Sequence, residues 1–114
     1  MAMRATLKLN RDFKRLYTKG KSAVSPLMVV YCRRSPSGVG RVGFTVSTKL
    51  GGAVRRNRIR RRLREVYRLT FPRLAPGWDM ILVARGRTYD ASFLSLQSAF
   101  QRCCRDLGVW GDKP

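Results

Sequence analysis

The chain has 114 residues, of which 25 are Lys or Arg and 6 are Asp or Glu, so its net charge is +19. This length fits one domain with a modest core, and a hydrophobic content of 44% argues against wholesale disorder. The chain has no His, and its few acids are scattered in sequence. Unless folding brings two acids together, this composition excludes the acid–base and metal chemistry of nucleases that act alone, and it favours a polyanionic partner.

Helical spacing of apolar residues predicts a first short helix over residues 11–19. Phe13 and Tyr17 stand one helical turn apart on it, among basic residues. This pattern fits plain core packing, and it equally fits a platform on which unpaired bases stack. The basic residues 1–9 before the helix have no regular pattern, and we expect them to be flexible.

Two segments rich in strand-forming residues follow, at 27–32 and 41–47. The stretch 35–40 between them is typical of a turn, so we predict that the two strands pair as an antiparallel hairpin. Tyr31 on the first strand completes a base-stacking cleft if the first helix lies across the sheet. The glycines of 38–43 match a dinucleotide-binding pattern, but the strand that follows them favours a flexible turn instead.

Residues 53–70 are predicted to form a basic helix, and eight of the fourteen residues from 55 to 68 are arginine. Spacing at about 100° per residue separates two sides of this helix. The apolar side comprises Ile59, Leu63, Val66, Tyr67 and Thr70. The opposite side comprises Asn57, Arg61, Arg64 and Arg68, flanked by Arg58 and Arg60. A solvated helix usually mixes charges, whereas an arc of guanidinium groups with the single acid Glu65 suits a sugar–phosphate backbone.

Residues 78–84 are predicted to form a strand that is apolar enough to be buried on both faces. A basic loop at 85–87 leads into a last helix over 91–107, and Asp90 is its expected N-terminal cap. We expect the tail, residues 108–114, to be frayed. The apolar side of this helix is predicted to be Phe93, Leu96, Phe100, Cys103 or Cys104, and Leu107.

The predicted order is α-β-β-α-β-α in a single RNA-binding domain over residues 1–114. This order is typical of an α+β protein, here an α/β sandwich with helices packed on one sheet. No stretch approaches the roughly 20 apolar residues of a membrane span. The cysteines, Cys32, Cys103 and Cys104, show no disulfide framework or zinc spacing, so we interpret them as core residues of a protein from the reducing cytoplasm.

The stretch from Val46 to Arg68 resembles the signature of the bacterial ribonuclease P protein subunit. It opens with Val-Ser-Thr-Lys-Leu-Gly-Gly-Ala-Val and continues into the arginine helix through Arg56-Asn57-Arg58. The resemblance implies an accessory subunit of a ribonucleoprotein whose large RNA uses Mg²⁺ to remove the 5′ leader of precursor tRNA. It also implies a fold like the second domain of a small-subunit ribosomal protein, with a left-handed βαβ crossover through the basic helix.

By motif match, the resemblance implies two sets of site residues and no catalytic or metal-binding residue on the protein. The residues that would face the catalytic RNA are Arg56, Asn57, Arg58, Arg60, Arg61, Arg64 and Arg68. Those that would line a cleft for the single-stranded leader are Phe13, Tyr17, Tyr31, Ser47 and Lys49. The implied partners are the large RNA and precursor tRNA, with no membrane and no obligate protein partner. Gly51-Gly52 departs from the family's usual glycine–polar pair, which implies a looser start to the basic helix.

Three other functions stay open at this point. A structural RNA-binding protein of the ribosomal type shares the charge and the fold class. A DNA-binding regulator would place the basic helix in a major groove and prefer duplex DNA. A nuclease acting alone would cleave RNA without any companion. Acceleration of leader removal by the protein together with the large RNA at low magnesium separates the ribonuclease P function from a structural RNA-binding protein. A preference for duplex DNA would indicate the regulator, and an assay of the purified protein free of RNA decides whether it is a nuclease.

Overall fold

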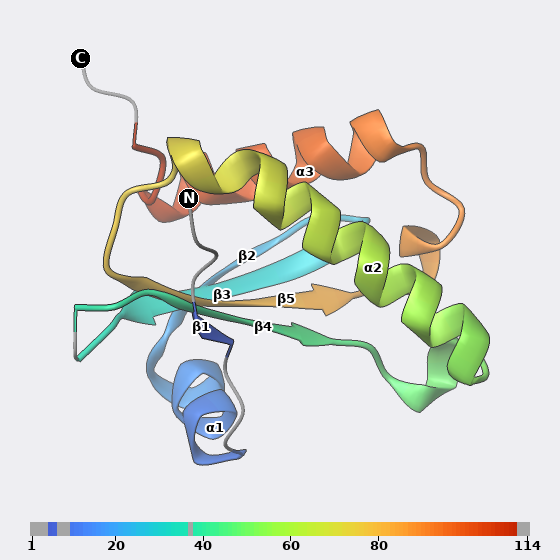
Figure 1. Ribbon diagram of the computed structural model, residues 1–114, viewed down its shortest axis with the longest axis horizontal. Coiled ribbons are helices and arrows are strands. Elements are labelled where there is room, and N and C mark those ends of the chain that lie inside the picture. Colours follow the sequence, from blue (N-terminus) through green and yellow to red (C-terminus); the bar gives the residue numbers. More distant parts are fainter. Residues whose placement is uncertain (1–4, 7–9, 37, 112–114) are drawn as a thin grey trace.

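The computed structural model describes residues 5–6, 10–36 and 38–111, and for residues 5, 6 and 10–12 the backbone alone. A sheet lies in the middle of the molecule, with helices on both of its faces (Figure 1). The helices α2 and α3 pack side by side on one face, and α1 lies on the other. The elements are β1 (Ala5–Thr6), α1 (Asn10–Lys19), β2 (Lys21–Val24), β3 (Met28–Arg34), β4 (Arg41–Thr45), α2 (Ala53–Thr70), β5 (Trp78–Ala84) and α3 (Phe93–Leu107).

The strands lie in the order β1-β4-β5-β3-β2. β5 pairs in parallel with β4 and antiparallel with β3, so the last strand of the chain occupies the centre of the sheet. The predicted hairpin between segments 27–32 and 41–47 is therefore wrong. The reason is that β5 is the most apolar strand, with Met80–Leu82 fully buried, and it needs partners along both edges.

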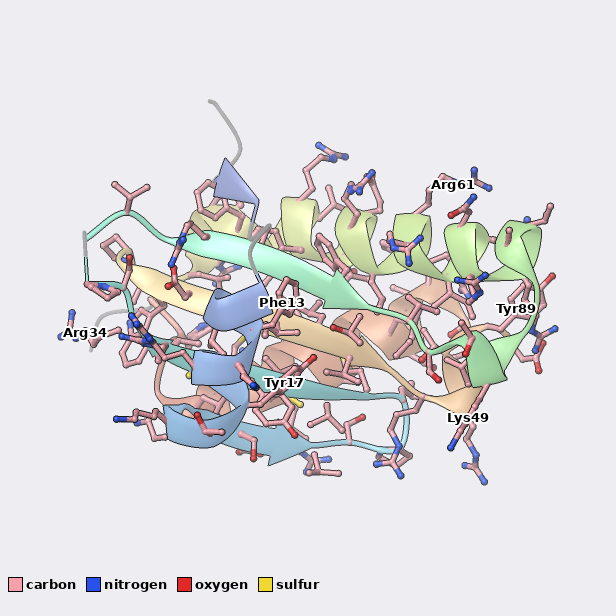
Figure 2. All side chains as sticks on the ribbon, turned by 90° about the horizontal axis from the view of Figure 1, so that it is seen from below. Phe13, Tyr17, Arg34, Lys49, Arg61 and Tyr89 are labelled. Carbon is pink, nitrogen blue, oxygen red and sulfur yellow. The ribbon has the colours of Figure 1, made fainter. Side chains whose placement is uncertain are left out.

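The chain passes from β4 through α2 to the parallel strand β5, and Figures 1 and 2 show that this crossover is left-handed. Nearly all such connections in proteins are right-handed. The structure thus confirms the α+β sandwich and the crossover that the family resemblance implies. It adds the short edge strands β1 and β2, which carry too few apolar residues to be recognised from the sequence.

The predicted bounds of the basic helix and of the buried strand agree with α2 and β5. The last helix differs, because Ser92 caps it in place of Asp90, and α3 begins at Phe93. The Ser92 hydroxyl accepts a hydrogen bond from the Ser95 amide at 3.1 Å. Asp90 lies two positions ahead of this cap, outside the first turn, and its side chain is exposed.

The predicted frayed tail, residues 108–114, is wrong as far as Gly111. Gly108 ends α3 in a left-handed conformation, with φ of 77°. Val109 is then fully buried, and its carbonyl accepts a hydrogen bond from the Ala75 amide at 2.8 Å. The Gly111 amide also donates to the Arg73 carbonyl at 2.7 Å, so this segment is held against the turn that precedes β5. Residues 112–114 lie outside the described part of the chain, as does most of the N-terminal segment 1–9.

The main core lies between the sheet and the layer formed by α2 and α3. All five predicted apolar residues of α2 are buried there, and Cys32, Cys103 and Cys104 are buried as free thiols. Burial raises the pKa of Cys103 to about 11 and also raises the pKa values of Cys32 and Cys104. The thiols therefore stay protonated near neutral pH and act as small apolar groups, as the sequence predicts.

One buried acid joins β4 to β5. Asp79 is 1% exposed, and its carboxylate accepts hydrogen bonds from the Arg41 amide and from the Arg41 guanidinium, both at 3.0 Å. Ionised groups at this depth are retained when they are paired and hydrogen-bonded. This ion pair fixes the two parallel strands at the end where both begin. Among the described helices, none is both long and apolar enough to cross a membrane.

Candidate nucleic-acid interface

The outward side of α2 forms a basic surface, which we call the arginine face: Asn57, Arg58, Arg60, Arg61, Arg64 and Arg68. The opposite side of α2 is buried against the sheet and α3, so these side chains face away from the core. Figure 2 shows Arg61 projecting from this outer side. Within the described part of the chain, Arg61 makes no hydrogen bond or ion pair, so its whole guanidinium is available to an anion.

Two arginines of the arginine face donate hydrogen bonds to other side chains of α2. Arg68 donates to both carboxylate oxygens of Glu65, at 2.9 and 2.6 Å, and these hydrogen bonds lower the pKa of Glu65. Arg60 donates to the Asn57 side-chain oxygen at 3.0 Å. Because Glu65 stays ionised at neutral pH, it offsets part of the Arg68 charge. Arg58, Arg61 and Arg64 are therefore the arginines of this face best placed to meet phosphates.

Arg55 and Arg56 hold the segment that leads into α2. The Arg55 Nε donates to the Leu50 carbonyl at 2.9 Å, and the Arg56 Nε donates to the Gly51 carbonyl at 3.0 Å. Gly51 has φ of 133°, and a Cβ atom there would lie 2.5 Å from the Arg55 Cδ, so only glycine fits. Arg56 was predicted to face RNA, but it is half-buried and spends one donor on this loop. The structure thus ties down a segment that the sequence implies to be loose.

Phe13, Tyr17 and Tyr31 gather on the opposite face of the sheet and form what we call the aromatic cluster. The ring centroids of Tyr17 and Tyr31 are 4.8 Å apart, with the rings edge to face, and those of Phe13 and Tyr17 are 6.4 Å apart. Leu16 and Ile81 anchor α1 to the sheet beneath them. The structure therefore brings together three residues that the sequence places on two different elements.

The aromatic cluster is only partly buried. Tyr17 is 39% exposed, and its hydroxyl lies 2.9 Å from the Thr45 hydroxyl on β4. Beyond α1 the same sheet face remains open, and Val24 on the edge strand is 68% exposed. The helix α1 that carries two of these rings also carries three exposed basic side chains, those of Lys14, Arg15 and Lys19. Rings with accessible faces beside cations suit an unpaired nucleic-acid strand, whose bases stack while its phosphates meet the charges.

Ser47 and Lys49 lie apart from the aromatic cluster. The Ser47 hydroxyl accepts a hydrogen bond from the Lys49 amide at 3.1 Å and caps the short 3₁₀ turn Thr48–Leu50. Both side chains are exposed. Figure 2 shows Lys49 near the end of the molecule at which α2 begins, away from Phe13 and Tyr17. These residues therefore stand at the start of the arginine face rather than inside the cluster.

The structure adds aromatic contacts that the sequence does not predict: the Arg64 guanidinium lies 5.8 Å from the ring centroid of Phe44, and Tyr89 contacts two arginines at the start of α2. Tyr89 lies in the loop before α3. The Arg55 guanidinium lies 3.8 Å from the Tyr89 ring centroid, and the Arg58 guanidinium lies 5.9 Å from it. The helical wheel gave no signal, since it places Arg55 on the apolar side of α2. A hollow of about 480 Å³ lies here, lined by Gly52, Ala53, Val54, Arg55, Arg58 and Tyr89.

The chemistry offered by these surfaces is the binding of anions and unpaired bases. The described residues contain no group of three His, Cys, Asp or Glu side chains that lie together as metal ligands. The buried acid Asp79 is engaged with Arg41, and the exposed acid Glu65 with Arg68. The geometry thus provides two RNA-compatible surfaces, one rich in arginine on α2 and one rich in aromatic rings beside α1.

Comparison with known proteins identifies the family. The family model described as Ribonuclease P matches residues 1–108. The chain is 42% identical over 103 residues to the "Ribonuclease P protein component" of Alkaliphilus oremlandii, a match that covers 90% of each protein. It is 38% identical over 104 residues to the protein of the same name from Clostridioides difficile, covering 90% of this chain and 91% of that protein.

Solved structures agree with the sequence comparison. The fold is similar to that of the Staphylococcus aureus RNase P protein, with a TM-score of 0.82, 32% identity, and coverage of 95% of this chain and 99% of that one. It is also similar to the RNase P protein from Thermotoga maritima, with a TM-score of 0.80, 27% identity, and coverage of 90% and 97%. With its sequence signature, its left-handed crossover and these relatives in agreement, the chain belongs to the ribonuclease P protein family.

Proposed function

We propose that this chain is the protein subunit of ribonuclease P and assists removal of the 5′ leader from precursor tRNA. The arginine face binds the large catalytic RNA, and the aromatic cluster binds the single-stranded leader. The observation that carries this proposal is the placement of two chemically distinct surfaces on opposite sides of one sheet, in a member of this family. A protein with both surfaces contacts the catalytic RNA and its substrate at the same time.

In this mechanism the protein contributes charge and geometry, and no protein group reacts. The arginines neutralise phosphates where the two RNAs meet, which favours their close approach. The aromatic cluster orients the leader and so lowers the entropic cost of reaching the cleavage geometry. In this proposal magnesium belongs to the RNA active site. The complex works in the cytoplasm, and the protein alone is not an enzyme.

The decisive experiment compares leader removal by a ribonuclease P RNA transcript with and without the purified protein at low magnesium. We expect the protein to accelerate cleavage at the mature 5′ end and to show no cleavage when the RNA is left out. A protein that binds the RNA without any acceleration would instead support the alternative, a structural RNA-binding protein of the ribosomal type. Cleavage by the protein alone would contradict the proposal outright.

Phe13→Ala is expected to weaken binding of leader-bearing precursor tRNA by about 5- to 150-fold and to leave binding of mature tRNA unchanged. The reason is that one stacked base contributes roughly 1–3 kcal/mol. The measurement is the Kd of each tRNA for the assembled complex. Tyr17→Phe is the matched control, because it keeps the ring and loses only the hydroxyl contact to Thr45. Equal losses for both tRNAs would show that the aromatic cluster does not contact the leader.

A further inference from the structure

Tyr89 contacts two arginines of α2 that repel each other. The guanidinium of Arg55 lies 3.8 Å from the ring centroid and that of Arg58 5.9 Å from it. The negative face of an aromatic ring attracts such cations. The Arg55 Nε is held as well, by its hydrogen bond to the Leu50 carbonyl at 2.9 Å. The terminal nitrogens of Arg55 form no hydrogen bond within the described part of the chain, so the side chain is fixed while its outer donors remain available.

The loop that carries Tyr89 is fastened at both sides. The Thr88 hydroxyl donates to the Leu27 carbonyl at 2.6 Å, which ties the loop to the turn before β3. On the other side, Arg62 of α2 donates to the carbonyls of Thr88 and Tyr89, at 2.9 and 2.7 Å, and to that of Ala91. The backbone around Tyr89 is therefore held in place, and its ring contacts arginines in the first turns of α2.

Fixing long side chains before binding has an energetic consequence. Arginine loses rotamer freedom when it grips a phosphate, and that loss opposes association. A side chain already held in one orientation avoids part of this cost. The hollow beside Tyr89 has two guanidinium groups and no acid in its lining, so its lining favours a bound anion.

We infer that Tyr89 is a positioning residue for RNA binding, which holds Arg55 and Arg58 in the orientation that meets the phosphates of the ribonuclease P RNA. The inference rests on the proposed function and deepens it. It means that a residue in the loop between β5 and α3 contributes to the affinity of α2 for RNA. Tyr89 acts through the arginines and makes no RNA contact of its own.

The test is a mutant cycle measured as the Kd of the full-length protein for a ribonuclease P RNA transcript. Tyr89→Leu is expected to weaken binding about three- to tenfold, the effect of releasing one or two long side chains. Tyr89→Phe, which keeps the ring, restores most of the affinity. In a protein that already carries Arg55→Ser and Arg58→Ser, adding Tyr89→Leu produces no further loss.

A second readout reports the arrangement in the free protein. The ring current of Tyr89 shifts the NMR signals of the Arg55 side chain upfield, and this shift disappears in Tyr89→Leu and persists in Tyr89→Phe. Thermal melts of all variants identify any loss of affinity that comes from unfolding.

Three results overturn the inference. They are an unchanged Kd for Tyr89→Leu, a loss for Tyr89→Phe as large as that for Tyr89→Leu, and a further loss when Tyr89→Leu is added to the double arginine variant. In each of these the wild-type protein still binds the RNA, so the proposed function stands. Failure of the wild-type protein to bind the transcript at all would remove the proposed function and this inference together.

Discussion

Replacing Arg58, Arg61 and Arg64 together by Ser should weaken binding of ribonuclease P RNA by about 100- to 1,000-fold near physiological salt. The physical reason is that each substitution removes one charge-assisted contact to a phosphate and the counterion release that accompanies it. The slope of log K against log salt should become shallower by about 2–3. Titrations at several salt concentrations measure both quantities. All three side chains are exposed on α2, so the fold should survive the change.

The matched control removes the same charge elsewhere. Lys21, Arg34 and Arg102 are also exposed, and their replacement by Ser lowers the net charge equally. Figure 2 shows Arg34 at the opposite end of the molecule from Lys49 and the start of α2. This variant should lose much less affinity, because its charges act only at a distance that salt screens. Equal losses in the two variants would mean that binding follows net charge and that the arginine face has no special role.

Asp79→Ala should destabilise the protein by about 3–5 kcal/mol, which corresponds to a fall in Tm of roughly 12–30 °C for a domain of this size. The carboxylate is 1% exposed and holds both the amide and the guanidinium of Arg41. Its removal leaves a half-buried guanidinium without this counter-charge and frees β4 from β5 at one end. Calorimetric or circular-dichroism melts of the purified variants give the measurement.

Asp106→Ala tests whether the loss of stability is specific to a buried, ion-paired aspartate. Asp106 is exposed on α3, so its replacement should change stability by no more than about 0.5 kcal/mol. Asp79→Asn keeps an acceptor for the Arg41 amide and should fall between the wild type and Asp79→Ala. A Tm for Asp79→Ala within 2 °C of the wild type would show that the ion pair contributes nothing net to stability.

Local patterns predicted the elements better than their arrangement. The basic helix was predicted at its observed bounds because apolar residues recur on one side of it from Ile59 to Thr70. The hairpin prediction failed because a strand pattern records which residues are buried and not which strand lies alongside. The Ser92 cap was missed because aspartate and serine both cap helices, so the local sequence does not distinguish Asp90 from Ser92. The docking of Val109 was missed because it depends on a contact with Ala75, which is distant in sequence.

The same limit applies to the candidate site. The wheel identified the outward arginines of α2, and helical spacing with the following strand identified Phe13, Tyr17 and Tyr31, which the structure brings together. The wheel did not reveal the role of Arg62, which lies among the other arginines of α2. All the described hydrogen bonds of Arg62 go to backbone carbonyls of the distant loop before α3. Contacts between residues far apart in sequence, such as Arg55 with Tyr89, carry no local signal.

The central position of β5 has a consequence for how the chain is made. β5 separates β3 from β4 in the sheet but follows both in the sequence. A nascent chain leaves the ribosome N-terminus first, so β3 and β4 emerge before the strand that joins them. Until residue 84 has emerged, the sheet lacks its middle, and α2 has no complete surface on which to bury its apolar side. Folding during translation therefore cannot advance strand by strand, and it is completed in one late step that inserts β5.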